Sequence, residues 1–298
     1  MSAGPISLSI IIPVYNAAAT LGRTFQSLER IAPNHRNRVE VVAINDGSTD
    51  GSAEMLRGAE LGQRGFAYQI LEQPNAGAGP ARNAGLSTAR GEWIFFLDAD
   101  DELMIDPVPV LDAAGALTCI GFALEYRRAD RPITWVKPVH LNSRNWASVL
   151  TAKNPFPSSS LVFRRSCIHA HFHPTIRCVE DWLFWMSNPS IFDRMKIFPG
   201  TVAAVIHLHE GNTSSQYARM GADRTRVAKL VEEMYSNSLT RRQRNNLYIQ
   251  RQIGKLQQGM RIPGETFIRF PCDARLYLKL LIYAASALAK VKATSYRS

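Results

Sequence analysis

The chain has 298 residues, of which 46% are hydrophobic and 20% are charged, a composition typical of one large or two modest globular domains. No run approaches the roughly 20 apolar residues of a membrane-spanning helix, and residues 1–5 lack the pattern of a secretory leader, so we expect a cytoplasmic protein. The net charge of +10 is concentrated after residue 214, where 16 Lys and Arg accompany five acidic residues. This segment alone therefore suggests an anionic partner, which could be membrane lipid, nucleic acid or a charged acceptor; the alternative is a solvated helical face.

Apolar runs and helical periodicities alternate along the first hundred residues. The pattern predicts strands at 8–12, 39–44, 68–71 and 93–97, and helices at 19–31, 52–61 and 79–89. Such alternation is typical of an α/β fold with a Rossmann-like, mostly parallel sheet and flanking helices. Since ligands bind at the carboxyl ends of parallel strands, we expect the residues that follow these strands to meet at one edge of the sheet.

The rest of the chain is less regular. We predict strands at 117–126, 133–139, 160–164 and 202–208, and a short helix at 144–150. The last 80 residues are helical in character, so we divide the chain into regions 1–105, 106–215 and 216–298. Within the last region, the apolar segment 276–289 is flanked by basic residues. It could lie in a membrane interface or dock on the core.

A cluster of acidic residues follows the predicted strand at 93–97. Asp98 and Asp100 alternate around Ala99, and Asp101 and Glu102 come next. Four acids within five residues repel one another unless a cation is present, and a divalent ion with oxygen ligands is the usual solution. The alternative is an acidic cluster that caps a turn or a helix.

Two further charged residues are candidates for the site: one follows a predicted strand and the other lies near the start of a predicted helix. Asp46 could accept hydrogen bonds from a nucleoside, or it could form an Asx-type turn at the end of its strand. Arg82 lies near the start of the helix opened by Gly79-Pro80, where a cation opposes the helix dipole. An anionic ligand at this helix end would remove the conflict. The alternative is an arginine that points into solvent.

Acidic and imidazole groups also occur near the end of the middle region. Glu180 and Asp181 precede Trp182 and an apolar run, as helix-capping acids do, but a single carboxylate could also serve as a general base. His207 and His209 alternate at a strand end and could contact a metal or a pyrophosphate. The first strand ends in Pro13-Val-Tyr-Asn16 instead of a Gly-rich loop, which argues against a dinucleotide or P-loop site.

Together these segments resemble the inverting family 2 glycosyltransferases, which have the GT-A fold. The resemblance covers roughly residues 6–215 and is thin between residues 107 and 179. The matching stretches are Ser9–Asn16, Ala43–Asp50, Asn75–Asn83, Trp93–Asp101 and Glu180-Asp181-Trp182.

The resemblance implies a role for each matching position. Asp181 would be the catalytic base, Asp100 and His209 would bind Mn²⁺ or Mg²⁺, and Glu180 and Trp182 would lie on the acceptor side. The family often has an arginine two residues before its histidine, and here that position is His207. The residues implied for the nucleotide-sugar donor are Pro13, Val14, Tyr15, Asn16, Asp46, Arg82, Asp98 and Ala99.

These roles imply a metal-dependent hexosyltransferase with the DXD motif. It would move a sugar from a nucleoside-diphosphate sugar, usually a UDP-sugar, to an acceptor hydroxyl in cell-surface polysaccharide or glycolipid synthesis. Region 1–105 would bind the donor, region 106–215 would bind a glycan or lipid-linked glycan, and the basic helical region 216–298 could hold the enzyme at the inner membrane face. We expect no nucleic-acid partner. The alternatives are an inactive sugar-nucleotide-binding scaffold and a nucleotidyltransferase, although the latter should carry a Gly-rich loop after the first strand.

Overall fold

The computed structural model describes residues 5–128, 131–209 and 216–260. The chain forms two compact units. The first contains the residues up to Trp146, together with Asn154–Thr175 and Glu180–His209. The second contains Ala147–Lys153, Ile176–Val179 and the chain after His209. The division into regions 1–105, 106–215 and 216–298 remains a prediction. A single sheet contains strands from both 1–105 and 106–215.

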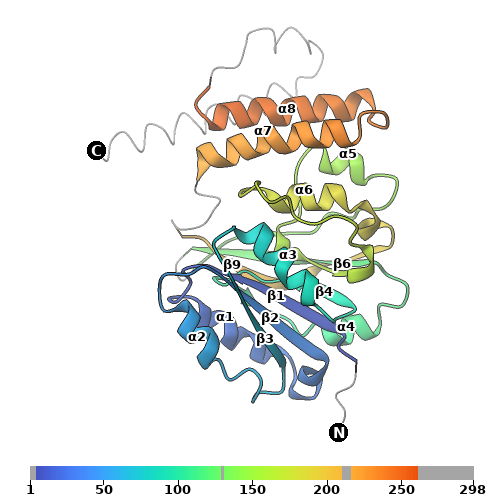
Figure 1. Cartoon of the computed structure of the whole chain (residues 1–298). Coiled ribbons are helices and arrows are strands. Elements are labelled where there is room, and N and C mark those ends of the chain that lie inside the picture. The colour runs from blue at the N-terminus through green and yellow to red at the C-terminus, as the bar shows by residue number, and fades with distance from the viewer. Residues whose placement is uncertain (1–4, 129–130, 210–215, 261–298) are drawn as a thin grey trace. The chain divides into compact units, whose positions relative to one another are not determined.

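The first unit is built on a nine-stranded sheet with the strand order β3-β2-β1-β4-β8-β6-β9-β5, in which β7 pairs with β6 (Figure 1). The predicted α/β architecture is confirmed. The strands are β1 (Leu8–Val14), β2 (Val39–Asp46), β3 (Ala67–Gln73), β4 (Trp93–Phe96), β5 (Glu102–Leu103), β6 (Cys119–Arg128), β7 (Arg131–Val136), β8 (Leu161–Arg164) and β9 (Met195–His207).

Helices cover both faces of the parallel part of the sheet, β3-β2-β1-β4. Ile10 and Ile12 of β1 belong to the same core cluster as residues of α1 and α2, whereas Ile11 points to the opposite face, toward α3. A side chain at Gly85 of α3 would come within 2.5 Å of Ile11, so this glycine lets the helix approach the sheet closely. Burial on both faces explains why β1, β2 and β4 are mostly apolar, whereas the edge strand β3 is only partly buried. The helices of the first unit and its boundary are α1 (Leu21–Ser27), α2 (Ser52–Gly58), α3 (Ala78–Thr88), α4 (Val108–Asp112), α5 (Trp146–Leu150) and α6 (Glu180–Ser187).

The other half of the sheet combines parallel and antiparallel pairs. β8 pairs antiparallel with β4 and β6, and β9 pairs parallel with β6 and antiparallel with β5. The strand predicted at 202–208 is the second half of β9, which begins at Met195. The sequence hides its first half because Pro199 and Gly200 interrupt the pattern, and the pairing with β6 shifts register just there.

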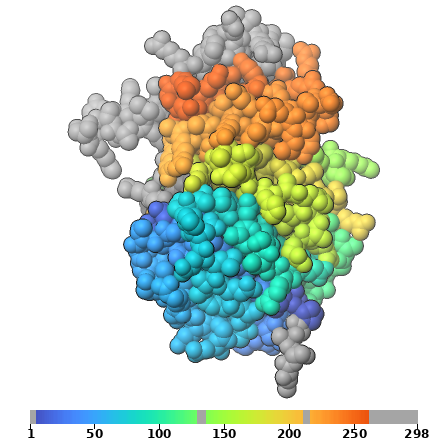
Figure 2. All heavy atoms as spheres, in the orientation of Figure 1, coloured from blue at the N-terminus to red at the C-terminus, as the bar shows by residue number. Residues whose placement is uncertain are grey.

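The second unit is a helical hairpin of α7 (Tyr217–Met234) and α8 (Arg241–Gln257), drawn in orange in Figure 2. The helices approach backbone to backbone, since a side chain at Gly221 would lie 2.4 Å from the carbonyl oxygen of Gly254. Thr240 begins α8 with a capping box to Gln243. Helices predicted from the last 80 residues are therefore present up to residue 260.

No helix within the described ranges is long and apolar enough to cross a membrane. The predicted amphipathic segment 276–289 lies outside the described residues.

Candidate functional site

The carboxyl ends of β1 and β2 carry the first group of predicted site residues. Pro13 and Val14 are the last two residues of β1, and Tyr15, which follows them, is 51% exposed despite its aromatic ring. Asn16 adopts a positive φ of 48° and donates its N–H to Ser48 Oγ at 3.1 Å. This sheet edge therefore presents an exposed ring, a flat surface on which a planar base could stack.

A set of side-chain hydrogen bonds fastens the loop after β1 to the loop after β2, and we call it the loop brace. Besides the bond to Ser48, Asn16 Oδ1 accepts from the N–H of Thr49 at 2.8 Å, and Asp50 Oδ2 accepts from the N–H of Ala18 at 3.0 Å. The Asx-type turn at the end of β2 is made by Asn45, whose Oδ1 accepts from the N–H of Ser48. The turn that we considered for Asp46 thus belongs to its neighbour.

Asp46 instead reaches across to the loop between β3 and α3. Its carboxylate is 2% exposed and accepts from Gln73 Nε2 and from the N–H groups of Ala76 and Gly77, all within 2.8 Å. Gly77 has a positive φ of 95° and precedes α3. Asp46 therefore shapes the start of the helix that carries Arg82.

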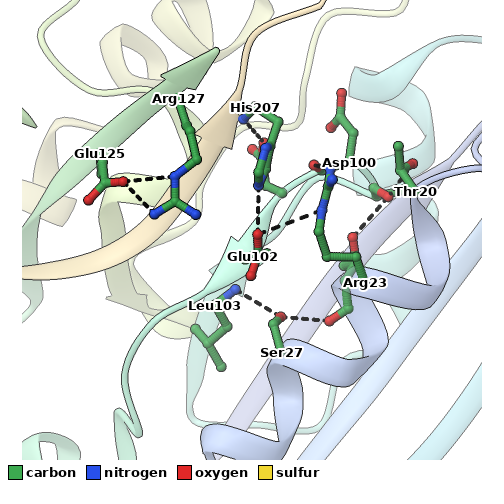
Figure 3. A network of polar contacts seen from close by, with 12 residues as sticks. Thr20, Arg23, Ser27, Asp100, Glu102, Leu103, Glu125, Arg127 and His207 are labelled. Carbon is green, nitrogen blue, oxygen red and sulfur yellow. Dashed lines mark hydrogen bonds and ion pairs between the residues drawn. The ribbon is translucent and has the colours of Figure 1, made fainter. Parts of the chain in front are cut away.

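The acidic loop after β4 is held by helix α1, as Figure 3 shows. Thr20 and Thr24 both donate to the carbonyl oxygen of Ala99 at 2.9 Å, and Arg23 Nη2 donates to the carbonyl oxygen of Asp100 at 2.9 Å. These bonds hold only the backbone of the acidic loop. The carboxylate of Asp100 instead contacts His209, which follows β9. Threonine hydroxyls spaced along a helix form no recognisable sequence motif, so the role of Thr20 and Thr24 could not be predicted from the sequence.

The end of β9 lies against the same loop. His209 Nε2 is 2.8 Å from Asp100 Oδ2, and His207 Nε2 is 2.7 Å from Glu102 Oε1. The N–H of His207 also donates to Asp101 Oδ1. The structure therefore brings together the two histidines and the acidic cluster, which are more than 100 residues apart in the sequence.

Like charges accumulate in this loop. Burial, followed by the neighbouring Asp98, raises the pKa of Asp100, and His209 partly offsets the rise. Burial and the charges of Asp100 and Asp98 raise the pKa of Asp101 well above its usual value. Within the described part of the chain, no group of three or more His, Cys, Asp or Glu side chains is arranged to hold a metal ion. A cation here would therefore need ligands from a bound substrate as well.

Arg82 lies inside the protein, contrary to the alternative of a solvent-exposed arginine. Its side chain is 3% exposed, and its two terminal nitrogens contact Asp98 Oδ1 and Glu180 Oε1, each at 2.7 Å. Arg82 Nη2 also donates to Ser158 Oγ at 3.3 Å, a partner that no sequence signal indicated. The anions beside this helix are thus carboxylates of the protein itself.

The start of α6 carries the predicted base. Val179, just before the helix, has a positive φ of 56°, an uncommon conformation for a β-branched residue and one found in strained, functional backbone. Asp181 Oδ1 accepts from the N–H of Trp182 at 2.7 Å, and the indole of Trp182 is buried. Burial and the neighbouring Glu180 raise the pKa of Asp181 to about 7, against lowering contributions from Arg82 and hydrogen bonds. A carboxyl group with this pKa exchanges protons near neutral pH.

Comparison with known proteins places the chain in a family. The model described as glycosyl transferase family 2 matches residues 9–159, just over half of the chain. The chain belongs to this family. It is a member of the family 2 glycosyltransferases, the family that the sequence resemblance indicated.

Two relatives of this glycosyltransferase show how far the sequence likeness extends. It is 32% identical over 191 residues to the putative glycosyltransferase EpsH of Bacillus subtilis, covering 60% of this chain and 54% of EpsH. It is 34% identical over 104 residues to the undecaprenyl-phosphate 4-deoxy-4-formamido-L-arabinose transferase of Aeromonas hydrophila, covering 35% of this chain and 32% of that enzyme. The chain thus spans about half or less of the length of these relatives.

Solved structures confirm the GT-A fold of this glycosyltransferase. It resembles residues 1–349 of Staphylococcus aureus TarS in complex with UDP-GlcNAc, with a TM-score of 0.62 and 17% identity over 96% of this chain and 80% of the other. It also resembles the mannosyltransferase PcManGT of Pyrobaculum calidifontis in complex with GDP-Man and Mn²⁺, with a TM-score of 0.61 and 15% identity over 97% and 89% of the two chains.

Proposed function

We propose that this glycosyltransferase moves a sugar from a UDP-sugar to an acceptor hydroxyl with inversion, in the synthesis of a cell-surface polysaccharide or glycolipid. The observation that carries the proposal is one connected site, in which Arg82 joins the acidic loop at Asp98 to the helix that carries Asp181. An acidic loop that could hold a cation against the leaving diphosphate, and a carboxyl group with a pKa of about 7, are the two parts that such a single displacement at a sugar carbon would use.

The donor end of the site would be the edge formed after β1, β2 and β4. The exposed ring of Tyr15 offers a surface for the base, and the neighbouring residues Pro13, Val14 and Asn16 shape its surroundings. Asp98 is 36% exposed at its side chain, and Arg82 occupies only its Oδ1 atom, so its other oxygen can accept from a ribose hydroxyl. Asp46, Arg82 and Ala99 would contribute through the loops and carboxylates that they hold. TarS in complex with UDP-GlcNAc supports a donor of this class.

A divalent ion fits the residues of the acidic loop. Asp100 and His209 face each other at 2.8 Å and would offer a carboxylate oxygen and an imidazole nitrogen to the ion. Burial and then the charge of Asp98 raise the pKa of Asp100, and a cation would favour its ionised form. Mn²⁺ or Mg²⁺ held there would supply positive charge against the leaving diphosphate. The complex of PcManGT with Mn²⁺ and GDP-Man supports this assignment.

The acceptor end would lie around the start of α6. Asp181 takes the proton of the acceptor hydroxyl, and Glu180 and Trp182 fix the first turn of the helix around it. One displacement with one base inverts the sugar. The acceptor proposed is a glycan or lipid-linked glycan, and the Aeromonas relative, named for undecaprenyl phosphate, supports the lipid-linked form.

The test of this function is a thermal-shift screen with UDP, UDP-GlcNAc and GDP-Man, each with and without Mn²⁺. A donor that binds the folded state at a hundred times its Kd stabilises it by about 2.7 kcal/mol, which corresponds to a rise of roughly 5 °C or more in Tm. We expect one nucleotide to give a metal-dependent rise that Asp100→Asn abolishes. Asp112→Asn, which removes an exposed carboxylate paired with Arg38, should keep the rise. If no nucleotide shifts Tm, the donor site is wrong. A shift without transfer would favour the inactive scaffold. Release of pyrophosphate from a nucleoside triphosphate and a sugar phosphate, supplied in a separate assay, would favour the nucleotidyltransferase.

Transfer by this enzyme should increase with pH. The base acts in its ionised form, and with a pKa of about 7 the ionised fraction of Asp181 grows about tenfold between pH 6 and pH 8. We therefore expect kcat at saturating donor to rise by about the same factor, with a midpoint near 7. A kcat that does not change across this range, or that is already maximal at pH 5, would remove Asp181 as the titrating base.

We further propose that the C-terminal segment binds an anionic membrane surface from the cytoplasmic side. Within residues 216–260, nine Lys and Arg accompany three acidic residues. Charge complementarity to anionic lipid supports the proposal. Co-sedimentation of the intact chain with anionic but not neutral vesicles, weakened by salt, is the expected result. The exposed cations on the two helices are Arg219, Arg226, Lys229, Arg241, Arg242 and Arg244.

A further inference from the structure

Arg82 connects three elements of the first unit through one buried guanidinium group. It extends from α3 and contacts Asp98, which follows β4, and Glu180, the first residue of α6. The two carboxylates are 82 residues apart in the sequence and share this single cation, Asp98 through Nη2 and Glu180 through Nη1. A planar fork can hold two carboxylates in fixed directions at once, which a lysine ammonium cannot do as rigidly.

The surroundings of Arg82 keep it in place and charged. The guanidinium carbon lies 5.6 Å and 5.5 Å from the ring centroids of Phe96 and Phe172, and both rings favour a cation at this position. Burial alone would lower the pKa of Arg82, but the charges of Asp98 and Glu180 raise it above the usual value. Helix α3 packs closely against Phe172 and Glu180 at Gly79, because a side chain at this glycine would lie 3.2 Å from Phe172.

We propose that Arg82 is a positioning residue for the transfer reaction. Its guanidinium holds the acidic loop through Asp98 and helix α6, which carries the base, through Glu180. This inference rests on the proposed function of Asp181 as the base. Removing the guanidinium would release both carboxylates at once. The acidic loop and the base would then lose their common support, although Arg82 itself touches neither the sugar nor the acceptor.

Arg82 also adjusts the charge around Asp181. The titratable or charged groups that act on Asp181 are Glu180 on its own helix, Arg82 from α3 and Tyr126 from β6, and hydrogen bonds from the N–H of Trp182 and the side chain of Asn154 also lower its pKa. Burial raises the pKa of Tyr126 to about 12, so this phenol is neutral at the pH of the reaction. Glu180 raises the pKa of Asp181 and Arg82 lowers it. Loss of Glu180 should therefore lower the pH at which the base ionises, and loss of Arg82 should raise it.

The experiment compares pH profiles of kcat for the wild type and for Arg82→Gln, Glu180→Gln and the double variant. We expect the midpoint to move upward by at least about half a pH unit in Arg82→Gln and downward by a similar amount in Glu180→Gln. The double variant should return toward the wild-type midpoint, because the two charges act on the same group. Shifts of opposite sign are not expected from a general loss of packing.

Arg82→Lys keeps the charge but not the fork, so it separates position from charge. We expect kcat to fall about tenfold or more with a nearly unchanged midpoint, since one ammonium cannot hold both carboxylates. Arg90→Lys is the matched control, because Arg90 pairs with the buried Glu40 at the opposite end of the strands and should leave kcat unchanged. If Arg82→Gln does not fold, Glu180→Gln and Arg82→Lys still provide the test.

The outcomes separate this inference from the proposed function. A wild-type chain that transfers no sugar overturns both. An active wild type whose Arg82 and Glu180 variants retain its midpoint and its kcat overturns the positioning role alone. Equal upward shifts in Arg82→Gln and Glu180→Gln would also overturn it, because the two charges would then not act in opposition on Asp181.

Discussion

Replacing Asp181 with asparagine is expected to lower kcat by about a thousandfold while donor binding stays unchanged. Loss of a positioned general base typically costs 10²–10⁴-fold in rate, and the amide keeps the shape of the side chain without accepting the acceptor's proton. The measurement combines product formation at pH 8 with the thermal shift produced by the donor and Mn²⁺. Asp112→Asn, which changes an exposed carboxylate, is the control and should transfer at the wild-type rate.

The stability of the Asp181→Asn variant distinguishes lost chemistry from lost folding. Because burial raises the pKa of Asp181 in the folded protein above its unfolded value, the folded chain binds the extra proton between about pH 4 and pH 7, and stability falls as pH rises through this range. Asparagine carries no charge to bury, so the variant should melt at the same temperature as the wild type or higher at pH 8. A variant with a lower Tm and unchanged kcat would contradict the assignment.

Replacing Glu40 with alanine should have the largest effect on stability. Glu40 is fully buried on β2, where it accepts from Ser9 Oγ at 2.6 Å, from Arg90 Nε at 2.8 Å and from the N–H of Gly91 at 3.2 Å. Arg90 is 56% exposed and can be solvated, but the buried Ser9 hydroxyl and Gly91 N–H would lose their carboxylate acceptor, at about 1–3 kcal/mol for each group. In a unit of this size, we expect Tm to fall by about 10 °C.

The contribution of Glu40 to stability should decrease as the pH falls. Burial alone would raise its pKa, but hydrogen bonds from Ser9 and Arg90 and the charge of Arg90 lower it overall. A carboxylate with a lowered folded pKa contributes stability above its unfolded pKa and loses it as pH falls through the folded value. The difference in Tm between wild type and Glu40→Ala should therefore be largest at neutral pH and shrink in acid. Glu54→Ala, at an exposed side chain paired with Arg57, should change stability by less than about 0.5 kcal/mol. Similar Tm values for both variants would contradict the role of Glu40.

The first four strands could be predicted from sequence because their apolar runs are a simple signal, strongest in β1, β2 and β4, which are buried. Three of the predicted strands lie within the observed ones, and the fourth, 93–97, extends one residue beyond β4. β2 continues two residues further, where Asn45 and Asp46 still pair with the neighbouring strands. The two-residue strand Glu102–Leu103 carries too little pattern to be recognised, and it is defined only by its partner β9. Non-local pairing of this kind cannot be read from a local window.

The candidate site divides in the same way. Strand ends predicted Asp98 and Asp100 at one edge of the sheet, and the family resemblance assigned His209 to the same metal as Asp100; in the structure the side chains of Asp100 and His209 lie 2.8 Å apart. The inward direction of Arg82 could not be predicted, because it depends on Glu180, which lies 98 residues later. Periodicity describes a helix face and says nothing about which distant carboxylate will meet it.

The loop brace ties nucleotide recognition to the assembly of the sheet. Its bonds connect residues 32 or 33 positions apart, and they form only when β1 and β2 are paired in the register that sets Val14 opposite Asn45. A slip of one residue would turn every side chain of the strand to the other face and leave Asn16 without Ser48 and Thr49. If the proposed nucleotide site uses these loops, nucleotide binding would report that β1 and β2 are paired in the correct register.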